Sequence, residues 1–145
     1  MQELSNIILT LPRYSKRAIA IITDISLCFV CTWLAFIIRL EELILLKDFY
    51  FYSAFISTII AIPIFWLFGS YRTIFRFAGL SIIFTVLISI LLYGLLYFLV
   101  IGVYGIQGVP RSVGILQPML LFFAIISSRL FINFILMSKL GSKKQ

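Results

Sequence analysis

Histidine is absent from this sequence, and cysteine is limited to Cys28 and Cys31. Without histidine the chain can hold neither a Ser-His-Asp triad nor a histidine-ligated metal. A zinc site needs more ligands than one C-x-x-C pair supplies, so we interpret both cysteines as small apolar residues of a helix. No GxxxxGK(S/T) phosphate loop is present. We therefore expect no catalytic residue, no metal and no cofactor in this chain, and no enzymatic activity of the chain by itself.

Charged residues are scarce as well. They make up 12% of the sequence against 63% apolar residues, and the mean hydropathy is +1.17. A single soluble domain of 145 residues needs a polar surface, because a small chain leaves much of its area exposed. So few charges cannot supply that surface. The composition therefore predicts a protein whose apolar surface is covered by a lipid bilayer.

The charges that are present are mostly positive, with a net charge of +7. A nucleic-acid-binding domain gathers its basic residues on one polar face. Here they fall in short segments between apolar runs, which is typical of membrane proteins. We therefore expect no nucleic-acid partner.

Four apolar stretches are each long enough to cross a bilayer as a helix, which takes about twenty residues. They cover approximately residues 18–38, 49–68, 80–101 and 113–137. Short connections between them imply antiparallel neighbours. The sequence therefore predicts an all-α fold: an integral membrane four-helix bundle over residues 18–138, preceded by segment 1–17 and followed by tail 139–145.

The distribution of Lys and Arg predicts the orientation, because cytoplasmic segments carry the excess of these residues. The larger group on one side of the predicted bundle has eight members: Arg13, Lys16, Arg17, Arg72, Arg76, Lys139, Lys143 and Lys144. The smaller group on the other side has three members: Arg39, Lys47 and Arg111. We therefore expect both termini, including segments 1–17 and 139–145, in the cytoplasm. Arg39 and Arg111 are candidate contacts on the outer side.

Asp24 and Arg129 are ionisable residues inside predicted spans, where charge is costly and serves either packing or function. Asp24 lies about one and a half to two helical turns into the first span. Arg129 lies at a similar depth in the fourth span, on the same side. We expect the two side chains to form an intramembrane polar pair. The sequence leaves open whether the pair fixes helix packing or serves a ligand or a proton.

A basic cluster, Tyr71, Arg72 and Arg76, lies in the predicted cytoplasmic loop between the second and third spans. Arg72 and Arg76 are four residues apart, so a helical loop would place both guanidinium groups on one face. Such a pair suits a phosphate, an anionic lipid headgroup or a partner protein. Simple anchoring of the topology by a basic loop is the alternative.

The same loop carries a resemblance to a known family. The run from Trp66 to Gly79, WLFGSYRTIFRFAG, resembles the cytoplasmic loop of the CapD-like polysaccharide biosynthesis proteins, which are membrane-bound nucleotide-sugar 4,6-dehydratases and epimerases of bacteria. The run from Gly108 to Pro118, GVPRSVGILQP, is similar to the start of their fourth span. The step from Ser127 to Arg129 matches a small-small-Arg step near the inner end of that span. Asp24 and Arg39 occupy places similar to an acidic and a basic residue of the family's first span.

The resemblance covers about residues 13–138 and implies a multi-pass protein of the bacterial cytoplasmic (inner) membrane. The family's NAD(P)-binding catalytic domain follows the fourth span and has no counterpart here, so NAD(P) would belong to that missing domain. The sequence leaves open whether the chain is a fragment, a split gene or free-standing.

We therefore expect a membrane-anchor module of a nucleotide-sugar dehydratase or epimerase. Its partners would be the bilayer, a cytoplasmic nucleotide-sugar enzyme domain or glycan-assembly membrane proteins, and a homo-oligomer is also open to it. One alternative is a small four-span transporter or lipid-carrier flippase component. Another is the N-terminal membrane region of a polyprenyl-phosphate sugar-phosphate transferase.

Overall fold

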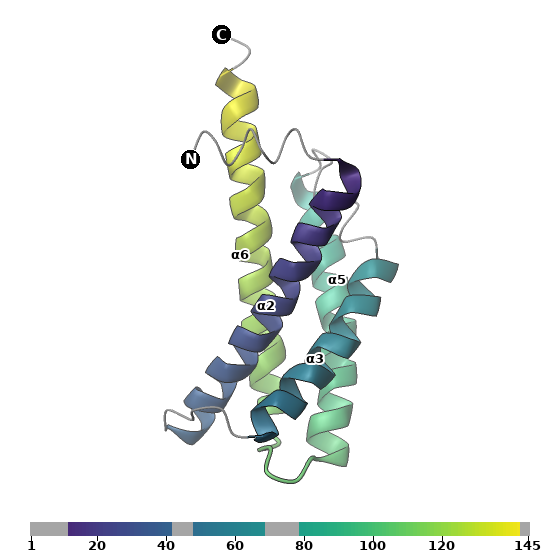
Figure 1. The fold of residues 1–145 in the computed structure, drawn as a ribbon, viewed down its shortest axis with the longest axis vertical. Helices are drawn as coiled ribbons and strands as arrows, with labels where there is room; N and C mark the ends of the chain where they lie inside the picture. Colours follow the sequence, from purple (N-terminus) through teal and green to yellow (C-terminus); the bar gives the residue numbers. More distant parts are fainter. Residues whose placement is uncertain (1–11, 42–47, 69–78, 143–145) are drawn as a thin grey trace.

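The computed structural model describes residues 12–41, 48–68 and 79–142 of the chain (Figure 1). No strand occurs within these residues. The helical elements are α2 (Arg13–Leu40), α3 (Asp48–Leu67), α5 (Gly79–Phe98), the π-helical segment η1 (Leu99–Tyr104) and α6 (Val113–Ser142). The predicted all-α class with four long apolar helices is confirmed over this part of the chain.

Each of these helices contains a stretch long and apolar enough to cross a membrane. The stretches are Arg17–Leu40, Tyr50–Leu67, Ile83–Tyr104 and Val113–Ile132. Only between 28% and 33% of the residues in these apolar stretches are buried inside the bundle. Most of the apolar side chains therefore face outward, where hydrocarbon is a better solvent for them than water.

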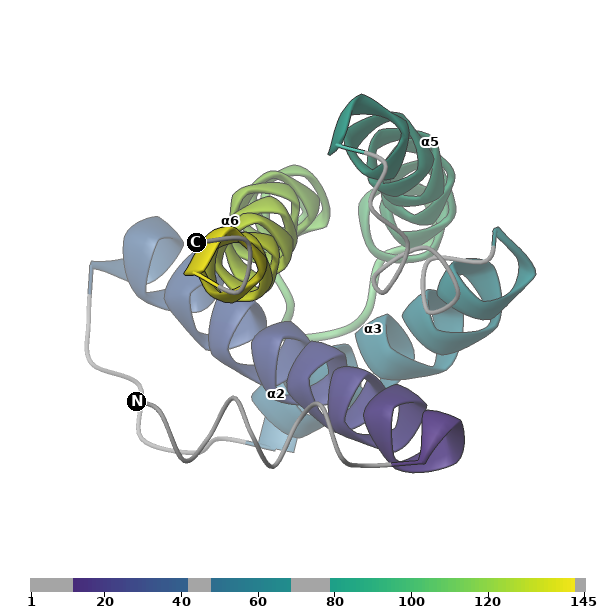
Figure 2. The same cartoon turned by 90° about the horizontal axis from the view of Figure 1, so that it is seen from above.

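The helices form a closed ring. α2 packs against α3, α3 against α5, α5 against α6, and α6 back against α2, as the view along the bundle shows (Figure 2). Consecutive helices run in opposite directions (Figure 1). We call the end that carries the C-terminus of α2 and the loop 105–112 the loop end. The opposite end, where α2 begins and α6 finishes, is the terminal end.

Two helices extend beyond the ranges expected from hydropathy. α2 begins at Arg13, directly after Pro12, whose extended backbone (φ −62°, ψ 156°) suits the residue before a helix. α6 continues to Ser142, ten residues past Ile132, where its apolar stretch finishes. The differences arise because hydropathy marks the part of a helix that suits hydrocarbon, whereas backbone hydrogen bonds set its full length.

The third apolar stretch does not finish at Ile101 but continues through η1. The N–H of Gly105 donates to the carbonyl oxygen of Val100, five residues earlier, at 3.2 Å, which is the π-helical pattern. Gly102 lies against the Phe98 ring, where an added Cβ would be 2.6 Å from a ring carbon. Gly105 then ends the segment at φ 74°, ψ 140°, a conformation open essentially to glycine alone.

We predict that Gly105→Ala lowers the free energy of unfolding by about 1–3 kcal/mol, because a side chain is strained at this backbone conformation. The measurement is SDS-induced unfolding of the detergent-solubilised chain, followed by circular dichroism. Gln107→Ala is the matched control, since Gln107 is an exposed residue of the same loop and its replacement should change stability little. Equal stability of the Gly105→Ala variant and the original chain would contradict the prediction.

Candidate functional site

The interior of the bundle is mainly apolar but contains polar side chains at several heights. Within the described residues, the buried polar or charged side chains, together with two buried tyrosines, are Asp24, Thr32, Ser53, Ser57, Ser89, Tyr93, Tyr97, Gln117 and Arg129. In hydrocarbon surroundings such groups can be satisfied only by other groups of the protein. The interior is therefore the place to look for a functional site.

Three of these side chains form a closed hydrogen-bonded ring between α3, α5 and α6. The Tyr93 hydroxyl donates to Gln117 Oε1 at 2.7 Å, and Gln117 Nε2 donates to Ser57 Oγ at 2.9 Å. Ser57 Oγ and Tyr93 Oη are 2.7 Å apart. Because the single tyrosine proton goes to Gln117, the Ser57 hydroxyl must donate to Tyr93. Each member of the ring thus donates one bond and accepts one bond.

A second hydrogen bond lies next to this ring. Ser53 Oγ and Tyr97 Oη are 2.7 Å apart, one helical turn along α3 and α5 from Ser57 and Tyr93. The Tyr93 and Tyr97 rings stack with centroids 5.6 Å apart. We call Ser53, Ser57, Tyr93, Tyr97 and Gln117 the interior polar cluster. The cluster fixes how three helices are rotated relative to one another, because its bonds depend on specific faces meeting.

The sequence contains a signal for this cluster. Ser53 and Ser57 are four residues apart, and so are Tyr93 and Tyr97, so each pair lies on one helix face. Uncharged polar residues are common in membrane helices, which makes each of them unremarkable alone. Only charged residues stand out within an apolar span, so the cluster was not predicted from the sequence.

The structure brings Asp24 and Arg129 together. Arg129 Nη2 donates to Asp24 Oδ2 at 2.8 Å, and the two side chains are only 4% and 2% exposed. Asp24 lies sixteen residues before Leu40, and Arg129 lies sixteen residues after Val113. Both are therefore ~24 Å along their helices from the loop end, at about 1.5 Å per residue. Equal height on antiparallel neighbours explains how two residues far apart in the sequence meet.

α2 is also joined to α3. Tyr50, at the start of α3, donates its hydroxyl proton to the carbonyl oxygen of Phe29 at 2.7 Å. The rings of Phe29 and Phe36 both meet the Tyr50 ring edge-on, with centroids 6.4 Å away. Each neighbouring pair of helices in the ring is thus joined by a polar contact. This bond joins α2 to α3, the interior polar cluster joins α5 to α3 and to α6, and the Asp24–Arg129 pair joins α6 to α2.

The remaining candidates from the sequence lie apart from this interior. Arg39 and Arg111 are both exposed at the loop end. Tyr71, Arg72 and Arg76 lie outside the described residues. Cys28 and Cys31 are buried thiols, so they face the bundle rather than lipid. In the part of the chain that the structure describes, no three His, Cys, Asp or Glu side chains gather as a metal site would require.

We predict that Tyr93→Phe lowers the free energy of unfolding by about 1–3 kcal/mol, because it removes two hydrogen bonds, each worth about 0.6–1.7 kcal/mol between membrane helices. The bond between Gln117 and Ser57 can remain. The measurement is SDS-induced unfolding. Tyr104→Phe is the matched control, because Tyr104 is 87% exposed and its hydroxyl lies outside the cluster. If both variants were as stable as the original chain, the ring would not contribute to stability.

We predict that Asp24→Leu and Arg129→Met each destabilise the bundle by about 3–5 kcal/mol, because each leaves a buried charge without its present counter-charge. The double variant should be much more stable than the sum of the two losses implies, since no buried charge is then left at this contact. A double-mutant cycle of unfolding free energies measures the coupling. Strictly additive losses would mean that the two charges do not depend on each other.

In comparisons with protein-family models, with curated proteins and with solved structures, nothing matches the chain. The likeness to the CapD-like proteins is therefore a hypothesis that rests on the loop and span motifs of the sequence.

Proposed function

We propose that this chain is a membrane anchor for an enzyme that modifies nucleotide sugars in bacterial polysaccharide biosynthesis. The closed interior is the observation that supports an anchor. The ring of Ser57, Tyr93 and Gln117 directs its donors and acceptors at one another, and Asp24 pairs with Arg129. A bundle held together from inside presents an apolar surface to lipid, as a stable anchor requires. The kind of enzyme is inferred from the motifs that resemble the CapD-like proteins.

In this proposal the terminal end faces the cytoplasm and the membrane is the bacterial inner membrane. The excess of Lys and Arg in the segments assigned to the terminal side supports this orientation. Arg17 is exposed near the terminal end, whereas Arg39 and Arg111 are exposed at the loop end. α3 finishes and α5 begins at the terminal end (Figure 1). In this proposal Arg72 and Arg76, which come between these two helices in the sequence, therefore also belong to the cytoplasmic side.

The length of α6 suits the attachment of a partner at this side. The helix runs ten residues past Ile132, which corresponds to ~15 Å at about 1.5 Å per residue. A continuous helix is a semi-rigid spacer, so it would keep a cytoplasmic partner near the membrane surface. Tethering raises the effective concentration of the partner's product beside a membrane-bound consumer. NAD(P) would be bound by the partner.

The interior polar cluster favours one other candidate, a small transporter or lipid-carrier flippase component, because transporters place polar groups inside the membrane. A transport path would require Ser57, Tyr93 and Gln117 to exchange their mutual bonds for bonds to a substrate. In the described residues these bonds are closed. The anchor therefore agrees better with the geometry.

We predict that the tagged full chain, purified in mild detergent from its native host, retains a nucleotide-sugar dehydratase or epimerase. Arg72→Gln with Arg76→Gln should reduce the recovered enzyme about fivefold or more, because two charge-assisted contacts would be removed. Arg39→Gln with Arg111→Gln is the matched control and should leave recovery unchanged, because both arginines lie at the opposite end. Quantitative mass spectrometry of the eluates is the measurement.

Three outcomes would contradict the anchor. One is recovery of no glycan-synthesis enzyme from any eluate. Another is a C-terminal reporter that is active only outside the cytoplasm, since the partner and the anchor would then face different compartments. The third is substrate flux into proteoliposomes that Gln117→Leu abolishes while the bundle stays folded, which would favour the transporter.

A further inference from the structure

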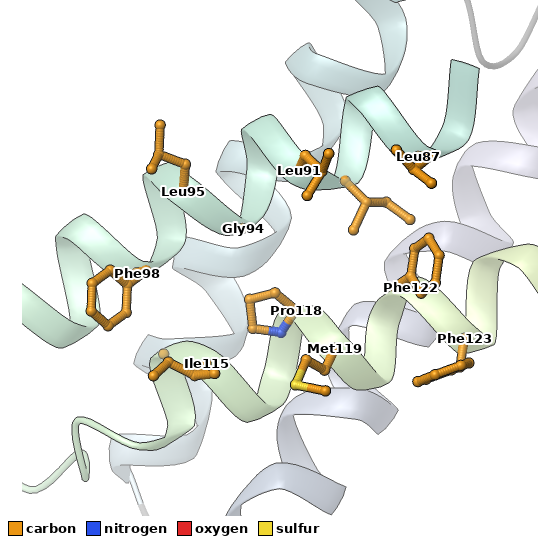
Figure 3. Close-up of a pocket in the computed structure, with 12 residues that line it drawn as sticks. Leu87, Leu91, Gly94, Leu95, Phe98, Ile115, Pro118, Met119, Phe122 and Phe123 are labelled. Carbon is orange, nitrogen blue, oxygen red and sulfur yellow. The ribbon is translucent and has the colours of Figure 1, made fainter. Parts of the chain in front are cut away.

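A groove runs along the seam between α5 and α6 on the outside of the bundle (Figure 3). Its volume is about 660 Å³, and every residue that lines it is apolar or glycine. Two rows of large side chains border it: Leu91 and Leu95 on α5, and Ile115, Met119 and Phe123 on α6. All five are more than half exposed, so the groove is open to the surroundings along its length.

The groove exists because α5 and α6 meet at small or ring-shaped residues. Gly94 faces Pro118, and a Cβ added at Gly94 would lie 3.2 Å from the Pro118 Cβ. Figure 3 shows the Pro118 ring directed at α5 beneath Gly94. Because Gly94 has no side chain, the surface between the two bordering rows is recessed at the centre of the seam. A hollow in a membrane-facing surface does not stay empty, because unfilled space forfeits dispersion contacts.

The length and lining of the groove suit an acyl chain. The α5 residues that line it run from Leu87 to Phe98, which is ~16 Å at about 1.5 Å per residue. The groove is wholly apolar and open along its length, so a flexible acyl chain can lie in it and follow its course.

A cation lies at the loop end of the same groove. The backbone carbonyl of Arg111 accepts a bond from the N–H of Gly114, a lining residue, at 3.0 Å. Arg111 Nε lies 3.9 Å from where a Cβ at Gly105 would be. The exposed Arg111 side chain, two residues before α6, therefore lies beside the residue that ends η1, just beyond the groove's loop end. Two other charged side chains that the structure describes at the loop end, Arg39 and Glu41, lie at the C-terminal end of α2, diagonally opposite α5 in the ring (Figure 2).

From this juxtaposition we propose that the α5–α6 groove and Arg111 together bind one anionic phospholipid, with an acyl chain in the groove and the headgroup phosphate at Arg111. The guanidinium group is suited to phosphate oxygens, since it offers two parallel donors and a fixed charge. Because Arg111 would contact the headgroup, this site would prefer anionic lipids, whereas the rest of the lipid-facing surface would not. The inference rests on the membrane insertion of the proposed function, but not on any enzyme partner.

The test is native mass spectrometry of the full chain in detergent, titrated separately with dioleoyl-phosphatidylglycerol and dioleoyl-phosphatidylcholine. The original chain should bind phosphatidylglycerol about fivefold more tightly, the factor expected from one basic residue beside an anionic headgroup. Arg111→Gln should remove this preference, and Arg39→Gln should keep it.

A second pair of variants tests the groove itself. Leu91→Trp should fill the groove and weaken the binding of both lipids. Ile59→Trp is its control, because Ile59 on α3 is 67% exposed and Leu91 is 66% exposed, while only Leu91 lines the groove. Circular dichroism checks that each variant remains folded.

The proposal is overturned if Arg111→Gln keeps the original preference, or if Leu91→Trp binds lipid as Ile59→Trp does. It is also overturned if the original chain forms dimers that Leu91→Trp dissociates, because a second copy would then occupy the groove. Alkaline extraction of membranes separates these failures from failure of the proposed function. A chain that resists extraction but lacks lipid preference refutes only the lipid site, whereas a chain that is released refutes both.

Discussion

The arrangement of the bundle depends on the cyclic hydrogen bonding of Ser57, Tyr93 and Gln117. The three residues come from α3, α5 and α6, and each gives one bond and receives one. Turning any one of these helices about its axis would break two of the three bonds. In hydrocarbon no water would replace them, so the free energy rises steeply with such a rotation. The cycle therefore selects one set of helix orientations, although apolar packing alone would tolerate several.

The Asp24–Arg129 pair complements this cycle at a different height. Gln117 and Arg129 are twelve residues apart on α6, which is ~18 Å at about 1.5 Å per residue. Contacts at one height resist rotation of a helix, but two heights are needed to resist splaying of the helices. α6 takes part in both contacts, and it is also the helix that continues farthest from the apolar region. The internal hydrogen bonds thus hold the projecting helix at a fixed angle to the rest of the bundle.

The sequence predicted those features that depend on length and charge alone. Apolar runs of spanning length gave the four helices, and a single acidic and a single basic residue inside the spans pointed to Asp24 and Arg129. It could not predict the interior polar cluster, because the meeting of Ser57 with Tyr93 depends on how far each helix is rotated, which hydropathy does not record. The sequence also did not predict η1. A glycine such as Gly102 near the end of an apolar run is expected both where a helix ends and where it continues as a π-helical turn.

The widened turn at η1 has a consequence for how the chain could change over evolution. A π-helical segment holds one residue more than an α-helix of the same number of turns. Ile101 still points inward and is fully buried, but Tyr104 points outward. Loss of that one extra residue would leave an α-helix with the same number of turns, so the residues on either side of the segment, Tyr97 before it and the loop after it, would keep their directions. At η1 the chain can therefore lose one codon with little effect on the interior that holds the helices together, whereas a deletion within a regular part of these helices would turn one half of the helix by about 100° against the other.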